Sequence, residues 1–183
     1  MESGDYKSFK FINVAPSGGT GGDWQTINEQ PDQTVVQQET PNACGHAGIQ
    51  MLLRWRGVNV SQLEVALTAG VPMEQTTGYD VLKAAANELD SSGNWEGGYV
   101  LETEIDSLTR KGLWMAQLQG NLGINRHWVV VEGIDDLGNL KIQDPWGINK
   151  KYVPTGAGTK YTMTRNDFEQ VWTLFVVYNE PNG

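Results

Sequence analysis

The sequence predicts an α+β domain, with helices in the first half of the chain and antiparallel strands in the second. The chain has 183 residues, a length that suits one domain with a sizeable hydrophobic core. Apolar residues recur at helical spacing between residues 43 and 89. After a turn at residues 91–94, the pattern changes to short runs rich in β-branched and aromatic residues. Helices followed by strands are typical of the α+β class.

The first expected helix covers residues 43–55, and Gly57 marks its end. The second begins at Ser61, which opens the capping-box sequence Ser-Gln-Leu-Glu, and ends at Gly70. Thr77 is expected to cap a third helix that extends to residue 89. The first half should therefore be a group of three helices.

The second half is expected to form an antiparallel sheet. The expected strands are residues 99–101, 114–118, 127–132, 140–143 and 174–178. Residues 136–139, Asp-Leu-Gly-Asn, are expected to form a hairpin turn between two of these strands. Thr164 should cap one last helix before the final strand.

Residues 1–34 are expected to form an N-terminal arm and a glycine-rich linker, and residues 35–183 the domain itself. The arm contains a strand-like run at residues 9–14 and a loop at residues 16–22 with four glycines.

Composition excludes several classes of function. The formal net charge of −9 disfavours binding to nucleic acid. No apolar run reaches the ~20 residues that span a bilayer, and the first residues lack the order of a secretory signal. We therefore expect a cytoplasmic protein, or one exported without a cleavable signal as part of a longer chain. The sequence does not indicate the oligomeric state.

The sequence also predicts no metal site and no cofactor. Two histidines and one cysteine without zinc-ligand spacing are too few for a metal centre. The glycines of residues 18–22 lack the Lys-Ser/Thr sequence of a phosphate-binding loop.

Cys44 is the only cysteine, so it is either a buried apolar residue or a reactive thiol. It lies in the first turn of the first expected helix, where the helix dipole and a nearby imidazolium would favour the thiolate. His127, at the start of an expected strand, would approach Cys44 only through folding. His46 is closer in sequence, but two steps along a helix point its side chain away from Cys44.

Asp144 is expected to accept a hydrogen bond from Nδ1 of His127, because the turn at residues 136–139 brings their strands together. Trp146 should shield this bond from water. Gln38 lies in a polar run that we expect to be exposed. Its amide could join the backbone N–H of Cys44 in binding an oxyanion. Each of these residues alone has an ordinary structural explanation, but the set favours a catalytic site.

These residues form motifs that resemble a known family. The motifs are Gln38-x5-Cys44-Gly45-x-Ala47-x3-Met51, His127-Trp128-Val129-Val130-Val131 and Asp144-Pro145-Trp146-Gly147. They resemble the papain-like cysteine peptidases of the bacteriocin-leader (double-glycine) type and their stand-alone relatives among bacterial effectors. The likeness covers roughly residues 35–178.

The resemblance implies a papain-like fold in which a helical part carrying Cys44 packs against a sheet carrying His127 and Asp144. It implies that Cys44 is the nucleophile, His127 the general base and acid, Asp144 the residue that orients His127, and Gln38 the oxyanion donor. The implied activity is that of a cysteine-dependent peptidase or amidase that acts on a polypeptide through an acyl thioester. Deamidases, isopeptidases and transglutaminase-like effectors or toxins use the same residues, and a peptide-binding module without cleavage is the competing class.

Overall fold

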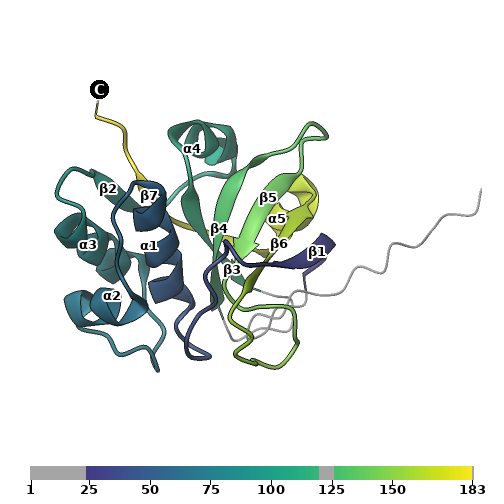
Figure 1. Cartoon of the computed structure of the whole chain (residues 1–183). Helices are drawn as coiled ribbons and strands as arrows, with labels where there is room; N and C mark the ends of the chain where they lie inside the picture. Colours follow the sequence, from purple (N-terminus) through teal and green to yellow (C-terminus); the bar gives the residue numbers. More distant parts are fainter. Residues whose placement is uncertain (1–23, 120–125, 183) are drawn as a thin grey trace, which may run out of the picture.

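A seven-stranded antiparallel sheet forms the centre of the computed structural model, which describes residues 24–119 and 126–182. The strands are β1 (Ile27–Asp32), β2 (Trp95–Tyr99), β3 (Trp114–Gln119), β4 (Arg126–Ile134), β5 (Leu140–Asp144), β6 (Gly158–Met163) and β7 (Trp172–Asn179). The helices are α1 (Cys44–Trp55), α2 (Gln62–Ala69), α3 (Tyr79–Leu89), α4 (Ile105–Lys111) and α5 (Arg165–Val171), with a 3-10 turn, η1 (Glu102–Glu104). The strand order is β1-β6-β5-β4-β3-β7-β2. Helices α1, α2 and α3 gather at one side of the molecule, and β1 lies at the opposite side (Figure 1).

The sheet separates two hydrophobic clusters, because side chains of a strand alternate between its faces. On β4, Val130 belongs to the cluster beneath α1, α2 and α3, together with Leu52 and Leu82. Its neighbour Val129 belongs to the other cluster, which includes Phe168 of α5. The α+β class predicted from the sequence is confirmed.

Most helix ends follow the sequence signals. Ser61 forms a complete capping box with Glu64, and Gly70 ends α2 with φ 67°. The Thr164 side chain accepts a hydrogen bond from the backbone N–H of Asp167. The expected cap at Thr77 is wrong. Gly78 is the residue that precedes α3, without a side-chain cap.

Several elements differ from the sequence-based expectation. The expected strand at residues 99–101 lies earlier, as β2, while β6 and α4 were not expected. The edge strand β1 was also missed, because its sequence Ile-Asn-Glu-Gln-Pro-Asp has no apolar alternation.

The described part of the expected arm contributes to the sheet. Strand β1 pairs with β6, and Trp24 is 2% exposed. The expected boundary between arm and domain, at residues 34 and 35, therefore separates β1 from the sheet to which it belongs. The strand-like run at residues 9–14 and the loop at residues 16–22 lie outside the described residues.

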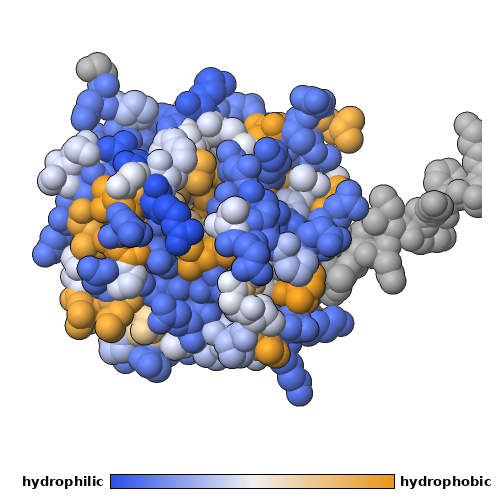
Figure 2. Space-filling model, in the orientation of Figure 1, coloured by the Kyte–Doolittle hydropathy of each residue, from blue (hydrophilic) through white to orange (hydrophobic). Residues whose placement is uncertain are grey.

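Hydrophilic residues cover much of the face drawn in Figure 2, and an apolar group lies over α2. Leu63 and Leu67 of that helix are exposed. Among the described residues, no helix combines the length and the apolar character needed to cross a membrane.

Candidate active site

Cys44 is the first residue of α1 and is buried, with 4% of its surface exposed. No side chain caps this helix, and its first turn carries no acidic residue. The positive end of the helix dipole therefore acts on the thiol without local neutralisation. Gly45 allows this placement, because a Cβ there would overlap Oγ1 of Thr77 and crowd Leu82.

His127 and Asp144 meet at the same end of the neighbouring strands β4 and β5. Nε2 of His127 lies 2.7 Å from Oδ1 of Asp144, and both side chains are 1% exposed. The nitrogen that meets Asp144 is thus Nε2, and the expectation that it would be Nδ1 is wrong. Local sequence carries no information on how the ring is turned, which depends on the tertiary positions of the two strands.

The electrostatic environment keeps this pair charged. Burial alone would lower the pKa of His127, but the charge and hydrogen bond of Asp144, together with the nearby Cys44 side chain, raise it to about 10. Burial by itself would raise the pKa of Asp144. The charge and hydrogen bond of His127, together with the hydrogen bond from the backbone N–H of Trp146, have a larger opposite effect, so the pKa of Asp144 is lowered. The pair is therefore an imidazolium and a carboxylate at neutral pH.

Two tryptophans enclose the imidazole. Trp146 meets it edge to face, with ring centroids 6.3 Å apart, and its backbone N–H donates to Oδ1 of Asp144 at 2.9 Å. Trp24 stacks on the ring at 5.9 Å with an interplanar angle of 18°. The position of Trp146 agrees with the prediction from the sequence. Trp24 was not predicted to contact His127, because it lies in the expected arm.

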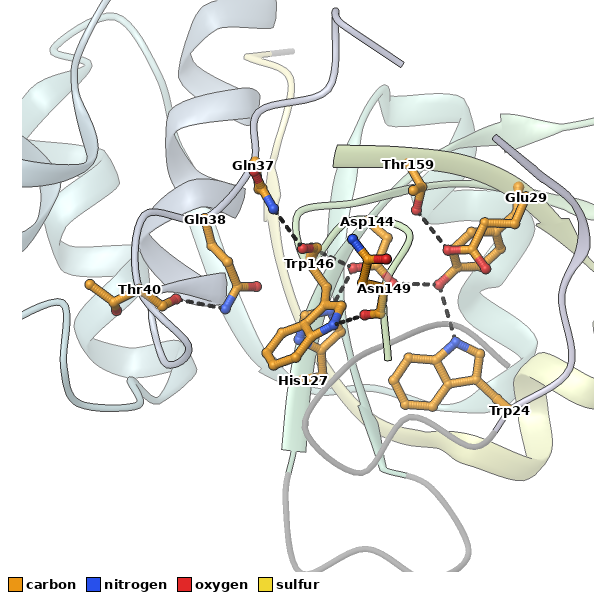
Figure 3. Close-up of polar contacts among 11 residues, drawn as sticks. Trp24, Glu29, Gln37, Gln38, Thr40, His127, Asp144, Trp146, Asn149 and Thr159 are labelled. Atoms are coloured by element: carbon orange, nitrogen blue, oxygen red, sulfur yellow. Dashed lines mark hydrogen bonds and ion pairs between the residues drawn. The ribbon is translucent and has the colours of Figure 1, made fainter. Parts of the chain in front are cut away.

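Gln38 is 1% exposed, so the expectation that it lies in an exposed run is wrong. Its backbone N–H donates to the carbonyl of Pro145 at 2.8 Å, and its carbonyl accepts from Tyr152 Oη at 2.7 Å. These bonds bury it against the loop that follows β5. Its side-chain Nε2 donates to the carbonyl of Thr40 at 2.9 Å, and its Oε1 is buried without a partner among the described residues (Figure 3).

The side chain of Gln37, unlike that of Gln38, binds the loop that follows β5. Its Nε2 donates to the carbonyls of Trp146 and Val153, at 3.1 and 2.7 Å. Its Oε1 accepts from the backbone N–H groups of Thr155 and Gly156, at 2.7 and 2.8 Å. The Gln37 amide is thus fully engaged in shaping the loop that carries Trp146.

His46 is bound elsewhere, as the helical spacing predicted. Its Nε2 lies 2.9 Å from the carbonyl oxygen of Val71, and burial lowers its pKa. The side chain is fully buried. His46 therefore holds the loop after α2 against α1, and His127 is the histidine paired with a carboxylate.

A second carboxylate near Asp144 was not expected from the sequence. A bulge at Asn28, with φ 54°, interrupts the pairing of β1 with β6. The next residue, Glu29, accepts a hydrogen bond from Thr159 Oγ1 at 2.9 Å (Figure 3). Burial, followed by the charge of Asp144, raises the pKa of Glu29 to about 7.

This raised pKa predicts a pH-dependent stability. The folded protein holds a proton on Glu29 that the unfolded chain has already lost, so stability falls as pH rises from about 4.5 to about 7. We expect Glu29→Gln to unfold at a higher temperature than wild type at pH 8 and at the same temperature at pH 4.5. The gain at pH 8 should be ~1–2 kcal/mol after allowance for partial solvent exposure.

Thermal unfolding at the two pH values measures this effect. Glu102→Gln, which replaces an exposed carboxylate on the 3-10 turn, is the matched control. An equal gain in both variants at pH 8 would attribute the effect to net charge and contradict a specific role of Glu29.

Within the described part of the chain, no group of three or more His, Cys, Asp and Glu side chains could hold a metal ion. The site thus consists of a buried thiol at a helix start, a charged histidine-carboxylate pair and a buried amide.

Comparison with known proteins places this chain in a family. The Peptidase C39 like family matches residues 30–178. The chain is 33% identical over 165 residues to cysteine protease effector 1 of Escherichia coli O1:K1:H7, covering 90% of this chain and 30% of that protein. It thus spans about a third of the length of this relative. It is also 30% identical over 114 residues to an uncharacterized protein of Methanothermobacter marburgensis, covering 62% of this chain and 72% of that one.

Solved structures show the same fold. The peptidase domain of Streptococcus ComA, a bifunctional ABC transporter involved in quorum sensing, has a TM-score of 0.60 at 21% identity, covering 80% of this chain and 97% of that one. A double glycine motif protease from an AMS/PCAT transporter, solved with the leader peptide, has a TM-score of 0.58 at 18% identity, covering 86% and 98%. The resemblance drawn from the motifs is confirmed, and the chain belongs to the Peptidase C39 like family of cysteine peptidases, with their papain-like fold.

Proposed function

We propose that the protein cleaves an amide bond of a polypeptide through an acyl thioester on Cys44. The observation that carries this proposal is the buried His127–Asp144 pair, whose imidazole interacts with the Cys44 thiol at the start of α1. In the proposed reaction the Cys44 thiolate adds to the carbonyl carbon, and His127 gives its proton to the leaving nitrogen as the C–N bond breaks. Water then adds to the thioester while His127 accepts its proton, and the thiolate leaves.

The charge state of His127 supports the first of these steps. A pKa of about 10 keeps the ring protonated at neutral pH, so it can stabilise a thiolate and serve as the acid. Asp144 has the role of orienting the ring, since its Oδ1 accepts from Nε2 and leaves Nδ1 for the thiol and the leaving group.

Two donors are proposed for the oxyanion of the tetrahedral intermediate. The backbone N–H of Cys44 is in the first turn of α1, where N–H groups have no partner within the helix. The Gln38 amide has a second hydrogen besides the one directed at Thr40. Both donors belong to buried residues, and a water-excluded position strengthens such donors.

The proposed substrate class is a polypeptide, and the proposed biological role is that of a bacterial effector peptidase. The name of the Escherichia coli relative and the leader peptide bound to the double glycine motif protease support these assignments. Deamidation, isopeptide cleavage or acyl transfer would use the same thioester. A module that binds peptide without cleaving it is the remaining alternative.

Alkylation of Cys44 tests whether the thiol is activated. We expect iodoacetamide to modify native protein at pH 6–7 much faster than urea-unfolded protein, because only the native state places the thiol beside His127. Mass spectrometry of the Cys44 peptide gives both rates. Equal rates in the two states would contradict an activated nucleophile and remove the basis of the proposal.

Incubation with a denatured proteome then separates the alternatives. We expect new peptide N-termini with wild type that are absent with Cys44→Ala. Residues whose mass rises by conversion of amide to acid, without new termini, would identify a deamidase. If Cys44 is alkylated rapidly but neither new N-termini nor deamidated residues are found, the result would favour a module that binds peptide without cleaving it.

A further inference from the structure

The carboxylate of Asp144 is held by more than His127 and Trp146. Its Oδ2 accepts a hydrogen bond from Tyr161 Oη at 2.8 Å. The same Oη accepts from Nε1 of Trp24 at 3.1 Å. A buried hydrogen-bonded series thus runs from the imidazole through Asp144 and Tyr161 to Trp24, whose indole nitrogen points toward this series in Figure 3.

Trp24 also reaches His127 directly. Its ring is nearly parallel to the imidazole, at 18° and 5.9 Å between centroids. The face of an indole attracts a cation at this range, so it favours the imidazolium, while the hydrogen bond through Tyr161 favours the carboxylate. Trp24 therefore acts on both members of the pair. It stacks on His127 directly, and it reaches Asp144 through the Tyr161 hydroxyl.

The segment of residues 24–32, which carries Trp24, is hydrogen-bonded to β6, the strand that carries Tyr161. Residues 24–32 comprise Trp24 and strand β1, which pairs with β6 at one end of the strand order of the described sheet. Glu29 accepts from Thr159 Oγ1 at 2.9 Å, and Thr159 lies opposite Asp144 in the pairing of β5 with β6. Main-chain pairing and this side-chain bond both hold the segment beside Asp144.

We propose that Trp24 and Tyr161 are positioning residues of the His127–Asp144 pair, and that residues 24–32 are consequently part of the catalytic apparatus. This inference rests on the proposed function. Held at Oδ2, the Asp144 carboxylate cannot rotate away from the imidazole, and the stacked indole restricts rotation of the ring. Exclusion of water by the buried indole strengthens the hydrogen bonds that Asp144 makes with His127 and Tyr161.

Three variants separate these contributions. Tyr161→Phe removes the bond to Asp144 Oδ2 and keeps the ring in the core. Trp24→Phe keeps an aromatic face on His127 but loses the N–H group, and Trp24→Leu loses both. Trp172→Leu is the matched control, because Trp172 is also buried in the cluster that contains Trp24 and its indole N–H bonds a backbone carbonyl, that of Phe175.

The measurement is the rate of Cys44 alkylation by iodoacetamide between pH 5 and pH 9, on protein shown to be folded by thermal unfolding. The reactivity of the thiol at pH 6 depends on the imidazolium beside it, and displacement of the rate profile by one pH unit changes the rate about tenfold. We expect Trp24→Leu to react ~10-fold more slowly at pH 6, with Trp24→Phe between it and wild type. Tyr161→Phe should show the same displacement of the profile, and Trp172→Leu should match wild type.

A nuclear magnetic resonance titration gives a second readout, with His46 as the internal comparison. The pKa of His127 should fall in Tyr161→Phe and Trp24→Leu, while that of His46 stays unchanged. If Trp24→Leu does not fold, Tyr161→Phe and Trp24→Phe decide the question.

The outcomes distinguish this inference from the proposed function. Wild-type protein that reacts no faster than unfolded protein would contradict the proposed function itself. An activated wild type with unchanged profiles in Tyr161→Phe and both Trp24 variants would overturn the positioning role alone. Equal losses in Trp24→Leu and Trp172→Leu would show that Trp24 serves only the core, and would also overturn it.

Discussion

His127→Gln is expected to lower turnover by ~10³–10⁶ while the protein remains folded. Glutamine can still donate a hydrogen bond to Asp144, so the buried carboxylate keeps a partner. It cannot carry the proton that the leaving nitrogen requires, nor can it stabilise a thiolate. Turnover of a peptide found by proteome cleavage measures this loss, with thermal unfolding as the measure of folding.

His46→Gln is the matched control, because the chain has two histidines and both are buried. We expect wild-type turnover per folded molecule and a loss of ~1–2 kcal/mol in the free energy of unfolding, since the bond to the Val71 carbonyl is disturbed. If His46→Gln were the inactive variant and His127→Gln the active one, the assignment of the base would be wrong.

Gln38→Ala is expected to lower turnover by ~10²–10³, because it removes one of the two proposed oxyanion donors. The backbone N–H of Cys44 should support the residual activity. The burial of Gln38 means that stability also falls, by ~1 kcal/mol for the lost bond to the Thr40 carbonyl. Steady-state kinetics should show the loss mainly in kcat, since the interaction strengthens in the transition state.

Gln37→Ala is the companion variant. It removes five side-chain hydrogen bonds to the loop of residues 146–156, so we expect a larger loss of stability, ~2–3 kcal/mol, and a smaller loss of turnover than in Gln38→Ala. Full turnover by Gln38→Ala would contradict its role as a donor. A greater loss in Gln37→Ala, measured on folded protein, would mean that the shape of the loop matters more than the amide of Gln38.

Local features of this protein are determined by its sequence. The caps at Ser61 and Thr164 and the left-handed end at Gly70 involve groups within a few residues of one another. The hairpin between β4 and β5 is equally local, since the backbone N–H of Asp135 bonds the carbonyl of Asn139. Such interactions leave a recognisable pattern in any stretch of chain, and the family motifs around Cys44 and His127 add to them.

Other features were decided only by the tertiary structure. Burial of Gln38 depends on the loop after β5. Which ring nitrogen of His127 meets Asp144 depends on where Asp144 lies in the folded sheet. The approach of Trp24 to His127 depends on the pairing of β1 with β6, two segments far apart in sequence. A polar edge strand buries little apolar surface, so its residues carry no periodic pattern, and its place is set by hydrogen bonds to a strand that the sequence analysis also missed. The sequence therefore determines which groups are available for catalysis, and the pairing of the strands and the packing of the helices determine which of them meet.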